Sequence, residues 1–409
     1  MSRKFSARLG FVIAVSALLL GASLAAHAQT ETVLYNFAGI PDGANSWSSL
    51  TADGKGNFYG TTNIGGMACA ETQSGCGTVF ELSPNGVGGL EETVLYRFCS
   101  EANCTDGANP LTSDLIFDGA GNPYGTTWNG GTNGYGAVFE LNHTGAGWKE
   151  TVLYSFGSYP GDGIGPFSGV IMDSAGNLYG TTQIDMNGGG GGTVFELSPS
   201  GGGWKEQVIY TAQAGEGIDA GLTMDAAGNI FGAGYYSVFE LSPNGNGGWN
   251  SRLIHSFRGY PHDGWFAYGT PAFDQEGNLY GTTLEGGKDD NGTVYKLSPV
   301  KKRWEERVLH SFKGTAHDGY EPFGGVTLDS AGNIYGTTSG ITSTNYGTIF
   351  ELVAPVGKGA YKEKIIRAFN NTDGGEPVGG LILDGAGNIY GTTILGGSNG
   401  YGVVFEVTP

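Results

Sequence analysis

Apolar residues in this chain are confined to short runs that alternate with polar or glycine-rich segments. One stretch shows the complete pattern, with a turn at 174–176 and apolar or alternating runs at 169–173, 177–182, 192–197 and 204–210. Short alternating runs rich in Tyr, Thr and Val are typical of β-strands, and glycine supplies the backbone freedom that a tight hairpin needs. No helical periodicity of adequate length follows the first 28 residues. The pattern therefore predicts units of four strands and no helices.

A motif marks each unit: an aspartate, a short turn, Gly-Asn, an apolar residue and Tyr-Gly-Thr-Thr. The copy at 225–234 has decayed, with Phe-Gly-Ala-Gly in place of Tyr-Gly-Thr-Thr. A repeat of this period indicates one supersecondary unit used again and again. The copies are spaced by 65, 55, 52, 49, 55 and 55 residues, and they begin at Asp53, Asp118, Asp173, Asp225, Asp274, Asp329 and Asp384.

The two ends of the chain carry complementary fragments of the unit. Residues 31–37 match the fourth strand without its preceding three, and residues 403–407 match the third strand with nothing after it. We therefore predict an all-β fold, a seven-bladed β-propeller with four antiparallel strands per blade. The N-terminal strand should complete the last blade, so that no open sheet edge remains. A solenoid is the alternative, but it requires no such offset between the ends.

The first 28 residues have the features of a secretory signal peptide. Arg3, Lys4 and Arg8 precede an apolar core at 9–24, and Ala26-His27-Ala28 fits a cleavage site. A retained membrane anchor is the alternative, and no second apolar stretch long enough to span a bilayer follows. We expect residues 1–28 to be removed and residues 29–409 to form a single propeller domain. The protein should be secreted or otherwise extracytoplasmic, in the periplasm or outside the cell.

Composition narrows the range of partners. Glycine accounts for 77 of 409 residues, but it stands at fixed repeat positions, with 21 Tyr and 21 Phe available for burial, as in a folded protein. The formal charge of −19 becomes about −22 when the three basic residues of the signal peptide are lost. Phosphate binding depends on clustered Lys and Arg, so we expect no nucleic-acid partner. So acidic a surface repels itself, and we expect a monomer.

All four cysteines, Cys69, Cys76, Cys99 and Cys104, lie in or beside the first unit. In an exported chain, two close pairs of cysteines indicate disulfides. The spacing favours Cys69–Cys76 and Cys99–Cys104, each closing one loop, although two other connectivities remain open. A zinc site of four thiolates is the alternative, but these spacings differ from those of zinc ribbons.

If the strands run outward from the channel, the loops from strand two to three and from strand four to the next blade share one face. The second class of loop carries an Asp-Gly pair in six of seven units, and the fourth unit has Gly217-Ile218-Asp219-Ala220 instead. Binding residues concentrate on loops over a rigid scaffold. We predict ligand-binding residues on this face at Asp42, Asp106, Asp162, Asp263, Asp318 and Asp373, and at the unrepeated tryptophans Trp47, Trp128 and Trp265.

Each of these residues has a structural alternative. An Asp-Gly pair is also a turn, in which Asp caps its own backbone, whereas the functional interpretation is ligation of calcium by the carboxylates. We expect no other metal or cofactor. Exposed tryptophans beside Asp and Asn can form a platform for sugar rings, or can pack within their own loops.

Histidines and catalytic motifs add little. His262-Asp263 and His317-Asp318 could form a metal or acid–base pair, whereas His255 and His310 replace the tyrosine of the fourth strand and are interpreted as structural. No catalytic residue is predicted. Gly-x-Ser-x-Gly occurs at 396–400, but no helix follows it, so it is interpreted as a loop.

The elements Tyr/His-x-Phe, Asp-Gly, Asp-x-x-Gly-Asn-Leu-Tyr-Gly-Thr-Thr, Gly-Gly and Gly-Thr-Val-Phe-Glu-Leu resemble the signature of bacterial choice-of-anchor tandem repeat GloVer proteins. The resemblance covers essentially all of residues 29–409. It implies an exported, often surface-held repeat protein of unassigned biochemical function. Many such proteins carry a C-terminal anchor segment, whereas this sequence ends at Val407-Thr408-Pro409, which argues against anchoring by such a tail. The Asn-Leu-Tyr stretch is also similar to the hairpins of NHL-type propellers, which concerns fold and not activity.

Three hypotheses for function follow. The first is a non-enzymatic exported module that binds carbohydrate or another cell-envelope ligand on its loop face. The second is a propeller-type glycan hydrolase or lyase, whose two carboxylates near the channel mouth would lie roughly 5–9.5 Å apart. The third is a purely structural envelope protein. Similarity between the units favours binding, because catalysis requires asymmetry, and the marked asymmetries are the cysteine-bearing first unit and the decayed fourth.

Overall fold

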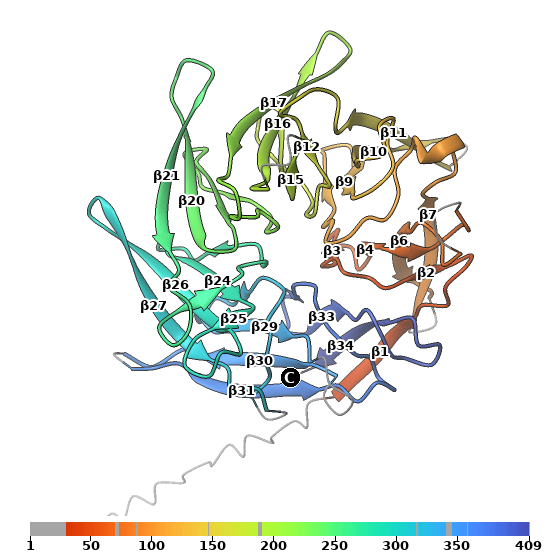
Figure 1. The fold of residues 1–409 in the computed structure, drawn as a ribbon. Helices are drawn as coiled ribbons and strands as arrows, with labels where there is room; N and C mark the ends of the chain where they lie inside the picture. The colour runs from red at the N-terminus through yellow and green to blue at the C-terminus, as the bar shows by residue number, and fades with distance from the viewer. Residues whose placement is uncertain are drawn as a thin grey trace, which may run out of the picture.

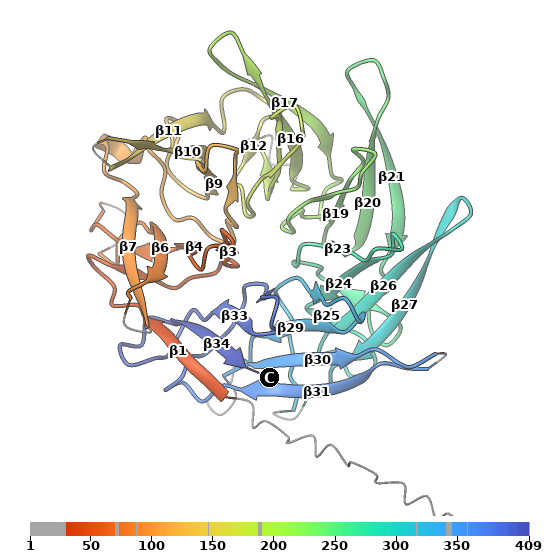
Figure 2. The same ribbon diagram turned by 180° about the vertical axis from the view of Figure 1, so that it is seen from behind.

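The computed structural model describes residues 30–408, apart from 70–72, 87–88, 146, 187–189, 316–317, 341–345 and 358. In this part of the chain, seven four-stranded antiparallel sheets stand as blades around a central axis (Figures 1 and 2). The short first strand of each blade lies nearest the axis, and the fourth lies at the rim. The predicted seven-bladed β-propeller is thereby confirmed. The predicted signal peptide at 1–28 lies outside the described residues.

The strands of each blade are given in order from axis to rim. Blades 1 to 3 are β3 (Thr51–Ala52), β4 (Phe58–Thr62), β6 (Thr78–Pro84) and β7 (Leu90–Arg97); β8 (Ile116–Phe117), β9 (Pro123–Thr127), β10 (Ala137–Thr144) and β11 (Gly147–Ser155); and β13 (Ile171–Met172), β14 (Leu178–Thr182), β16 (Thr193–Ser200) and β17 (Gly203–Thr211). Blades 4 and 5 are β18 (Thr223–Met224), β19 (Ile230–Ala233), β20 (Ser237–Pro243) and β21 (Trp249–Ser256); and β23 (Ala272–Phe273), β24 (Leu279–Thr283), β26 (Thr293–Val300) and β27 (Arg303–Ser311). Blades 6 and 7 are β28 (Thr327–Leu328), β29 (Ile334–Thr338), β30 (Thr348–Val353) and β31 (Lys362–Ala368); and β32 (Ile382–Leu383), β33 (Ile389–Thr392), β34 (Val403–Thr408) and β1 (Thr30–Asn36).

Smaller elements decorate the loops. One short 3-10 helix, η1, spans Ala102–Cys104. Three two-stranded ribbons pair the loop before a blade with the loop after its second strand: β2 (Gly43–Ala44) with β5 (Ile64–Gly65), β12 (Gly163–Ile164) with β15 (Ile184–Asp185), and β22 (Gly264–Trp265) with β25 (Glu285–Gly286).

The N-terminal strand β1 closes the ring as the outer strand of blade 7. It pairs antiparallel with β34, so that Thr30 lies opposite Thr408 and Asn36 opposite Val403. Leu34 and Tyr35 pack against a buried cluster that contains residues from both ends of the chain. The predicted completion of the last blade is confirmed, and the two ends are joined in one sheet (Figure 1).

The aspartate of the repeat motif holds its hairpin together. In blade 3, Asp173 Oδ1 accepts the backbone N–H groups of Ala175 (2.8 Å) and Asn177 (2.9 Å). Its Oδ2 accepts the Asn177 side-chain amide (2.8 Å) and the Tyr179 hydroxyl (3.1 Å). Burial alone would raise the pKa of Asp173, but the bonds from Asn177 and Tyr179 hold that pKa below its ordinary value. These hydrogen bonds give the hairpin aspartate a structural role.

The Gly-Thr-Thr of the motif joins neighbouring blades. A side chain at Gly180 would lie 2.5 Å from the ring of Phe195, so only glycine fits there. The Thr181 hydroxyl donates to the Ala220 carbonyl of the next blade (3.2 Å). Equivalent bonds start from Thr61, Thr126, Thr282, Thr337 and Thr392. Blade 4 has Ala233 at this position, which has no hydroxyl, so its decayed motif cannot make this bond.

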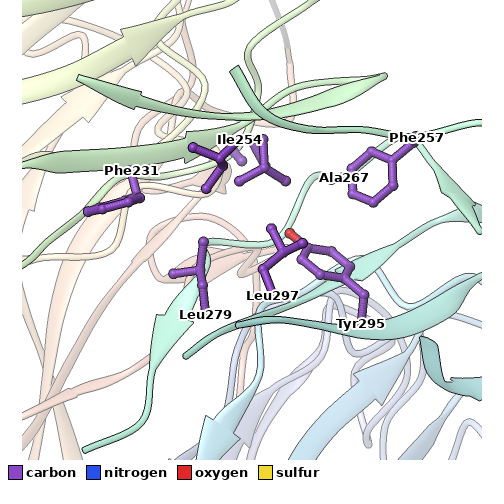
Figure 3. Packing of buried hydrophobic residues seen from close by; sticks show 10 residues of the cluster. Phe231, Ile254, Phe257, Ala267, Leu279, Tyr295 and Leu297 are labelled. Carbon is purple, nitrogen blue, oxygen red and sulfur yellow. The ribbon is translucent and has the colours of Figure 1, made fainter. Parts of the chain in front are cut away.

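Hydrophobic cores lie between neighbouring blades. Figure 3 shows the core between blades 4 and 5, where Phe231 and Ile254 face Leu279 and Leu297. A buried aromatic residue on the third strand recurs in every blade: Phe80, Phe139, Phe195, Phe239, Tyr295, Phe350 and Phe405. The repeated tryptophans at the start of the fourth strand pack against such cores and are half-buried: Trp148, Trp204, Trp249 and Trp304.

Candidate functional site

The loops before each blade and the loops after its second strand lie on one face, as predicted. Backbone hydrogen bonds connect the two classes directly, for example from Gln183 N–H to the Gly165 carbonyl (3.0 Å). Leu284 N–H donates in the same way to the Phe266 carbonyl (2.9 Å). This face therefore carries the start of every first strand and the end of every second strand, beside the mouth of the central channel.

The Asp-Gly aspartates of this face point inward, between neighbouring blades. Tyr154 on the outer strand of blade 2 donates its hydroxyl to Asp162 (2.8 Å), and the backbone N–H of Ser158 caps the same carboxylate (2.8 Å). Glu206, on the outer strand of the next blade, faces this aspartate. We call each such cluster a rim seam. The six seams are Tyr35–Asp42–Glu92, Tyr96–Asp106–Glu150, Tyr154–Asp162–Glu206, His255–Asp263–Glu306, His310–Asp318–Glu363 and Arg367–Asp373–Glu31.

Packing two carboxyl groups together changes their acidity. Burial, followed by the charge of Asp42, raises the pKa of Glu92 to about 8. Burial and Asp106 raise the pKa of Glu150 to about 8. Each pair therefore holds one proton at neutral pH, and its aspartate already has donors within the protein. These contacts correspond to the turn interpretation of the aspartates, while their role in ligand binding stays a prediction.

Between blades 3 and 4 the seam keeps its tyrosine, Tyr210, but lacks both carboxyl groups. The Tyr235 N–H donates to the Gly217 carbonyl (3.1 Å), just as the Gln183 N–H donates to the Gly165 carbonyl, so Gly217 is the counterpart of Gly165. The seam aspartate Asp162 stands three residues before Gly165, and the residue three before Gly217 is Ala214. Ser251 likewise stands where the next outer strand has glutamate. Asp219, which we had aligned with the Asp-Gly pairs, is therefore not their counterpart. Asp219 lies five residues after Ala214, at the channel mouth.

The histidines also differ from the sequence interpretation. The side chain that approaches Asp263 is His255 of β21 (Nε2 to Oδ2, 3.4 Å), whereas His262 is exposed. His310 of β27 contacts Asp318 in the same way (2.6 Å). His317 lies outside the described residues. Sequence neighbours were paired in the prediction, but the strand-to-loop contact brings residues eight apart together.

Both predicted disulfides are present. Cys69 is bonded to Cys76 and Cys99 to Cys104. Cys76 and Cys104 are buried with Ala108, and the other two cysteines pack against them. The two bridges thus form one small core that holds two loops of blades 1 and 2 together.

The unrepeated tryptophans occupy different places on the loop face. Trp128 is 36 % exposed and its indole covers the backbone of Gly165, where a side chain would lie 2.6 Å from the ring nitrogen. Trp265 is 38 % exposed and covers Gly259. Trp47 alone reaches the channel mouth, where its ring meets that of Phe323 at 5.9 Å.

Four aromatic side chains converge at this mouth, and we call them the channel-mouth platform: Trp47, Phe167, Tyr268 and Phe323. Each stands six residues before its hairpin aspartate, in blades 1, 3, 5 and 6. Tyr268 and Phe323 stack with centroids 4.8 Å apart and planes 9° apart, and Phe167 lies 6.4 Å from both. All four are half-buried. Of these, the sequence analysis identified only Trp47; alignment of the seven units would have revealed the shared position.

An acidic group adjoins the platform at the decayed fourth unit. Asp219 is 2 % exposed, and its Oδ2 accepts the Tyr235 hydroxyl (2.9 Å) and the Gln183 amide (3.4 Å). Burial raises the pKa of Asp219 to about 6, although both hydrogen bonds lower it. The ring of Tyr235 lies 5.6 Å from that of Tyr268. We call Asp219, Tyr235 and Gln183 the acid corner.

A cavity of about 190 Å³ lies on the axis and is lined by platform residues and first-strand segments. Glycines allow those segments to approach closely: a side chain at Gly324 would lie 2.7 Å from the Gly379 carbonyl. Asp114 also lines the cavity and accepts the Ser49 N–H (2.6 Å). Its burial raises its pKa. The mouth therefore combines aromatic surface with buried carboxyl groups.

Comparison with known families supports the sequence resemblance. The model of the Gloeobacter/Verrucomicrobia repeat matches residues 66–237 and 233–409. The chain belongs to the Gloeobacter/Verrucomicrobia (GloVer) repeat family. The two matches together include the decayed fourth unit of this GloVer protein. No curated protein matches its sequence.

Solved structures share the fold of this GloVer protein at low identity. Streptogramin B lyase matches with a TM-score of 0.57 and 12 % identity over 93 % of this chain and 97 % of its own. Virginiamycin B lyase from Staphylococcus aureus gives the same values, with 99 % of its chain covered. An ancestral GH74 enzyme matches with a TM-score of 0.56 and 11 % identity, over 88 % of this chain and 50 % of its own. Among the described residues, no helix is long and apolar enough to cross a membrane.

Proposed function

We propose that this protein is a binding module whose channel-mouth platform recognises a carbohydrate. The convergence of four half-buried aromatic rings from four different blades carries this proposal. Pyranose rings present C–H groups on one face, which pack on aromatic surfaces, and hydroxyl groups around their edge, which need hydrogen bonds. The platform supplies the first requirement, and polar groups around it supply the second.

The position of the aromatic residues argues for a ligand rather than for packing alone. Aromatic side chains that serve only the core are fully buried between blades, as Phe195 and Phe350 are. The platform residues instead stand at the mouth, and the units of blades 2, 4 and 7 have Thr112, Asp219 and Val378 at the equivalent position. The aromatic surface is therefore confined to part of the mouth, which suits a ligand that contacts some blades and not others.

Glycan binding tests this proposal directly. Residues 29–409 are screened against polysaccharides, and affinity for the best ligand is measured by calorimetry. Replacing both Tyr268 and Phe323 by alanine should lower affinity at least tenfold, because stacking adds on the order of 1 kcal/mol per ring beyond buried area. Tyr260→Ala, which removes an exposed aromatic residue outside the platform, should leave affinity unchanged.

The outcome of the same titrations can contradict the proposal. Unaltered affinity in the double variant, with an unchanged melting temperature, would exclude the platform as the binding surface. Added calcium should leave affinity unchanged, since the rim-seam aspartates already accept hydrogen bonds within the protein. A calcium-dependent affinity would instead favour ligation by the Asp-Gly loops.

A glycan hydrolase or lyase at the same mouth is the second candidate, and the acid corner favours it. A carboxyl group whose pKa is raised to about 6 is protonated in part of the molecules near neutral pH, and that fraction can act as a general acid. If the bound glycan is cleaved, Asp219→Asn should lower the rate at least about 100-fold while binding persists. The wild-type rate should fall as pH rises above 6. Cleavage that is unaffected by Asp219→Asn would remove this carboxyl group from the mechanism.

We also propose that the protein acts outside the cytoplasm. The two disulfides support this, because disulfides persist in oxidising compartments and are rare in reducing ones. Fractionation of expressing cells, with and without residues 1–28, tests the proposal. Cytoplasmic retention of the full chain would contradict it.

A further inference from the structure

We propose that His255, Asp263 and Glu306 bind one divalent transition-metal cation, such as Zn²⁺, in the rim seam between blades 4 and 5. His255 lies on β21, the outer strand of blade 4, and Glu306 on β27, the outer strand of blade 5. Asp263 belongs to the loop that leaves β21. One ligand atom from each residue lies within 4.8 Å of the other two.

The three ligand atoms are buried and have no hydrogen-bonding partner among the described residues. Asp263 is 0 % exposed, and its Oδ1 accepts the backbone N–H groups of Arg258 (2.5 Å) and Gly259 (2.9 Å), which fixes the carboxylate. Its Oδ2, the His255 Nε2 and the Glu306 Oε1 make no hydrogen bond. Leaving several buried polar atoms unsatisfied is costly unless something binds between them.

The ligand set and its spacing suit a transition metal. Imidazole nitrogen with carboxylate oxygen is a ligand combination that Zn²⁺ and its neighbours accept, whereas calcium prefers oxygen alone. Ligands about 2.1 Å from a tetrahedral zinc ion stand roughly 3.4 Å from one another. His255 Nε2 and Asp263 Oδ2 are 3.4 Å apart. A fourth ligand would come from water at the rim.

Each of the other seams also contains a buried glutamate oxygen without a hydrogen-bonding partner, but each places a closer side-chain donor on its aspartate than the His255 seam does. Three seams use a tyrosine hydroxyl, which lies 2.8–3.0 Å from its aspartate. One uses the guanidinium of Arg367, which bridges Glu31 and Asp373. In the His310 seam the imidazole is hydrogen-bonded to Asp318 (2.6 Å), and the Lys313 ammonium stands 3.0 Å from the second oxygen.

In the His255 seam, the cation that corresponds to the Lys313 ammonium makes a longer contact with its aspartate. Arg258 occupies the position of Lys313, but its Nε stands 3.5 Å from Asp263 Oδ2 and its side chain is 68 % exposed. An exposed guanidinium at this distance can turn outward and leave the carboxylate to a cation. The site would tie blade 5 to blade 4, the blade whose own seam toward blade 3 has lost both carboxyl groups.

Calorimetric titration with ZnCl₂ tests the proposal on residues 29–409, prepared without an affinity tag and freed of metal by chelation. We expect about one equivalent of zinc to bind and to raise the melting temperature. His255→Tyr removes the nitrogen ligand and installs the tyrosine used by three other seams, so it should fold and lose this equivalent. His310→Tyr makes the same exchange in the neighbouring seam and should retain it.

Two results would overturn the proposal: no saturable zinc binding to the wild-type protein, or one equivalent still bound by a folded His255→Tyr variant. Loss of the equivalent in His310→Tyr rather than in His255→Tyr would do the same. Because Tyr replaces His in an arrangement that this chain already uses, unfolding is not expected to obscure the comparison. Circular dichroism of each variant checks this directly.

Discussion

A chain that begins at Phe37, and so lacks β1, will lose most of its stability and associate with itself. Blade 7 then has no outer strand, and the edge of β34 is left unpaired over six residue pairs. Removal of Leu34 and Tyr35 also uncovers the buried Val404. We expect the free energy of unfolding to fall by at least about 5 kcal/mol, comparable with the total stability of many domains. Denaturant titration measures the fall, and size-exclusion chromatography detects association through the open edge.

A circular permutant provides the matched control. Thr30 lies opposite Thr408, so a short hairpin loop can join residue 408 to residue 30, with the new N-terminus at Phe37. This permutant contains every residue pair of the native blade 7 and should unfold at nearly the native midpoint. If the truncated chain were as stable as the permutant, ring closure by β1 would not be a source of stability.

Stability should decrease as pH rises from 5 to 8.5, with the melting temperature falling by at least about 5 °C. The glutamates of the three tyrosine seams cause this: burial and the facing aspartates raise the pKa of Glu92 and Glu150 to about 8, and burial raises that of Glu206 to about 7. Between pH 4.5, the ordinary pKa of a glutamate, and these raised pKa values, the three glutamates are protonated in the folded state but not in the unfolded state. Stability is therefore fully present below pH 4.5 and is lost up to about pH 8, by at most about 1.4 kcal/mol per pH unit and group. Partial exposure reduces that slope.

Replacing these three glutamates by glutamine separates the contribution of their protons from other causes of pH-dependent stability. The triple variant Glu92→Gln, Glu150→Gln and Glu206→Gln offers an amide donor to each aspartate at every pH. Its melting temperature should vary less with pH and should exceed that of the wild type at pH 8.5. Glu91→Gln, an exposed neighbour, should change nothing. An unchanged pH dependence in the triple variant, measured by scanning calorimetry, would show that the seams do not hold protons.

Much of the fold could be predicted because its determinants are local and repeated. The Asp173 hairpin closes within a few residues, through bonds to Ala175, Asn177 and Tyr179, so its signature is continuous in the sequence. The fragments at 31–37 and 403–407 revealed ring closure, because a strand without its blade must find the blade without that strand. Alternation of apolar residues then determined which side of each strand is buried.

The candidate site was harder to predict, because its members come from different blades. Trp47 and Phe323 are 276 positions apart in the sequence and meet only because the ring brings blades 1 and 6 to one axis. The rim seams likewise join a strand, a loop and the next blade. Their pattern is visible in the sequence as Glu-x-x-x-Tyr/His/Arg followed by Asp, but nothing local indicates that the glutamate belongs to the neighbouring seam.

The sequence by itself determined the repeating unit, the number of blades, the joined ends and the two close cysteine pairs, since each depends on residues near one another or on exact repetition. Only the tertiary structure decided that the Asp-Gly carboxylates point inward and that Asp219 stands at the channel mouth. It also decided that His255, and not His262, faces Asp263. These outcomes depend on how neighbouring blades pack, and that packing sets burial and charge contacts between residues that no local pattern relates.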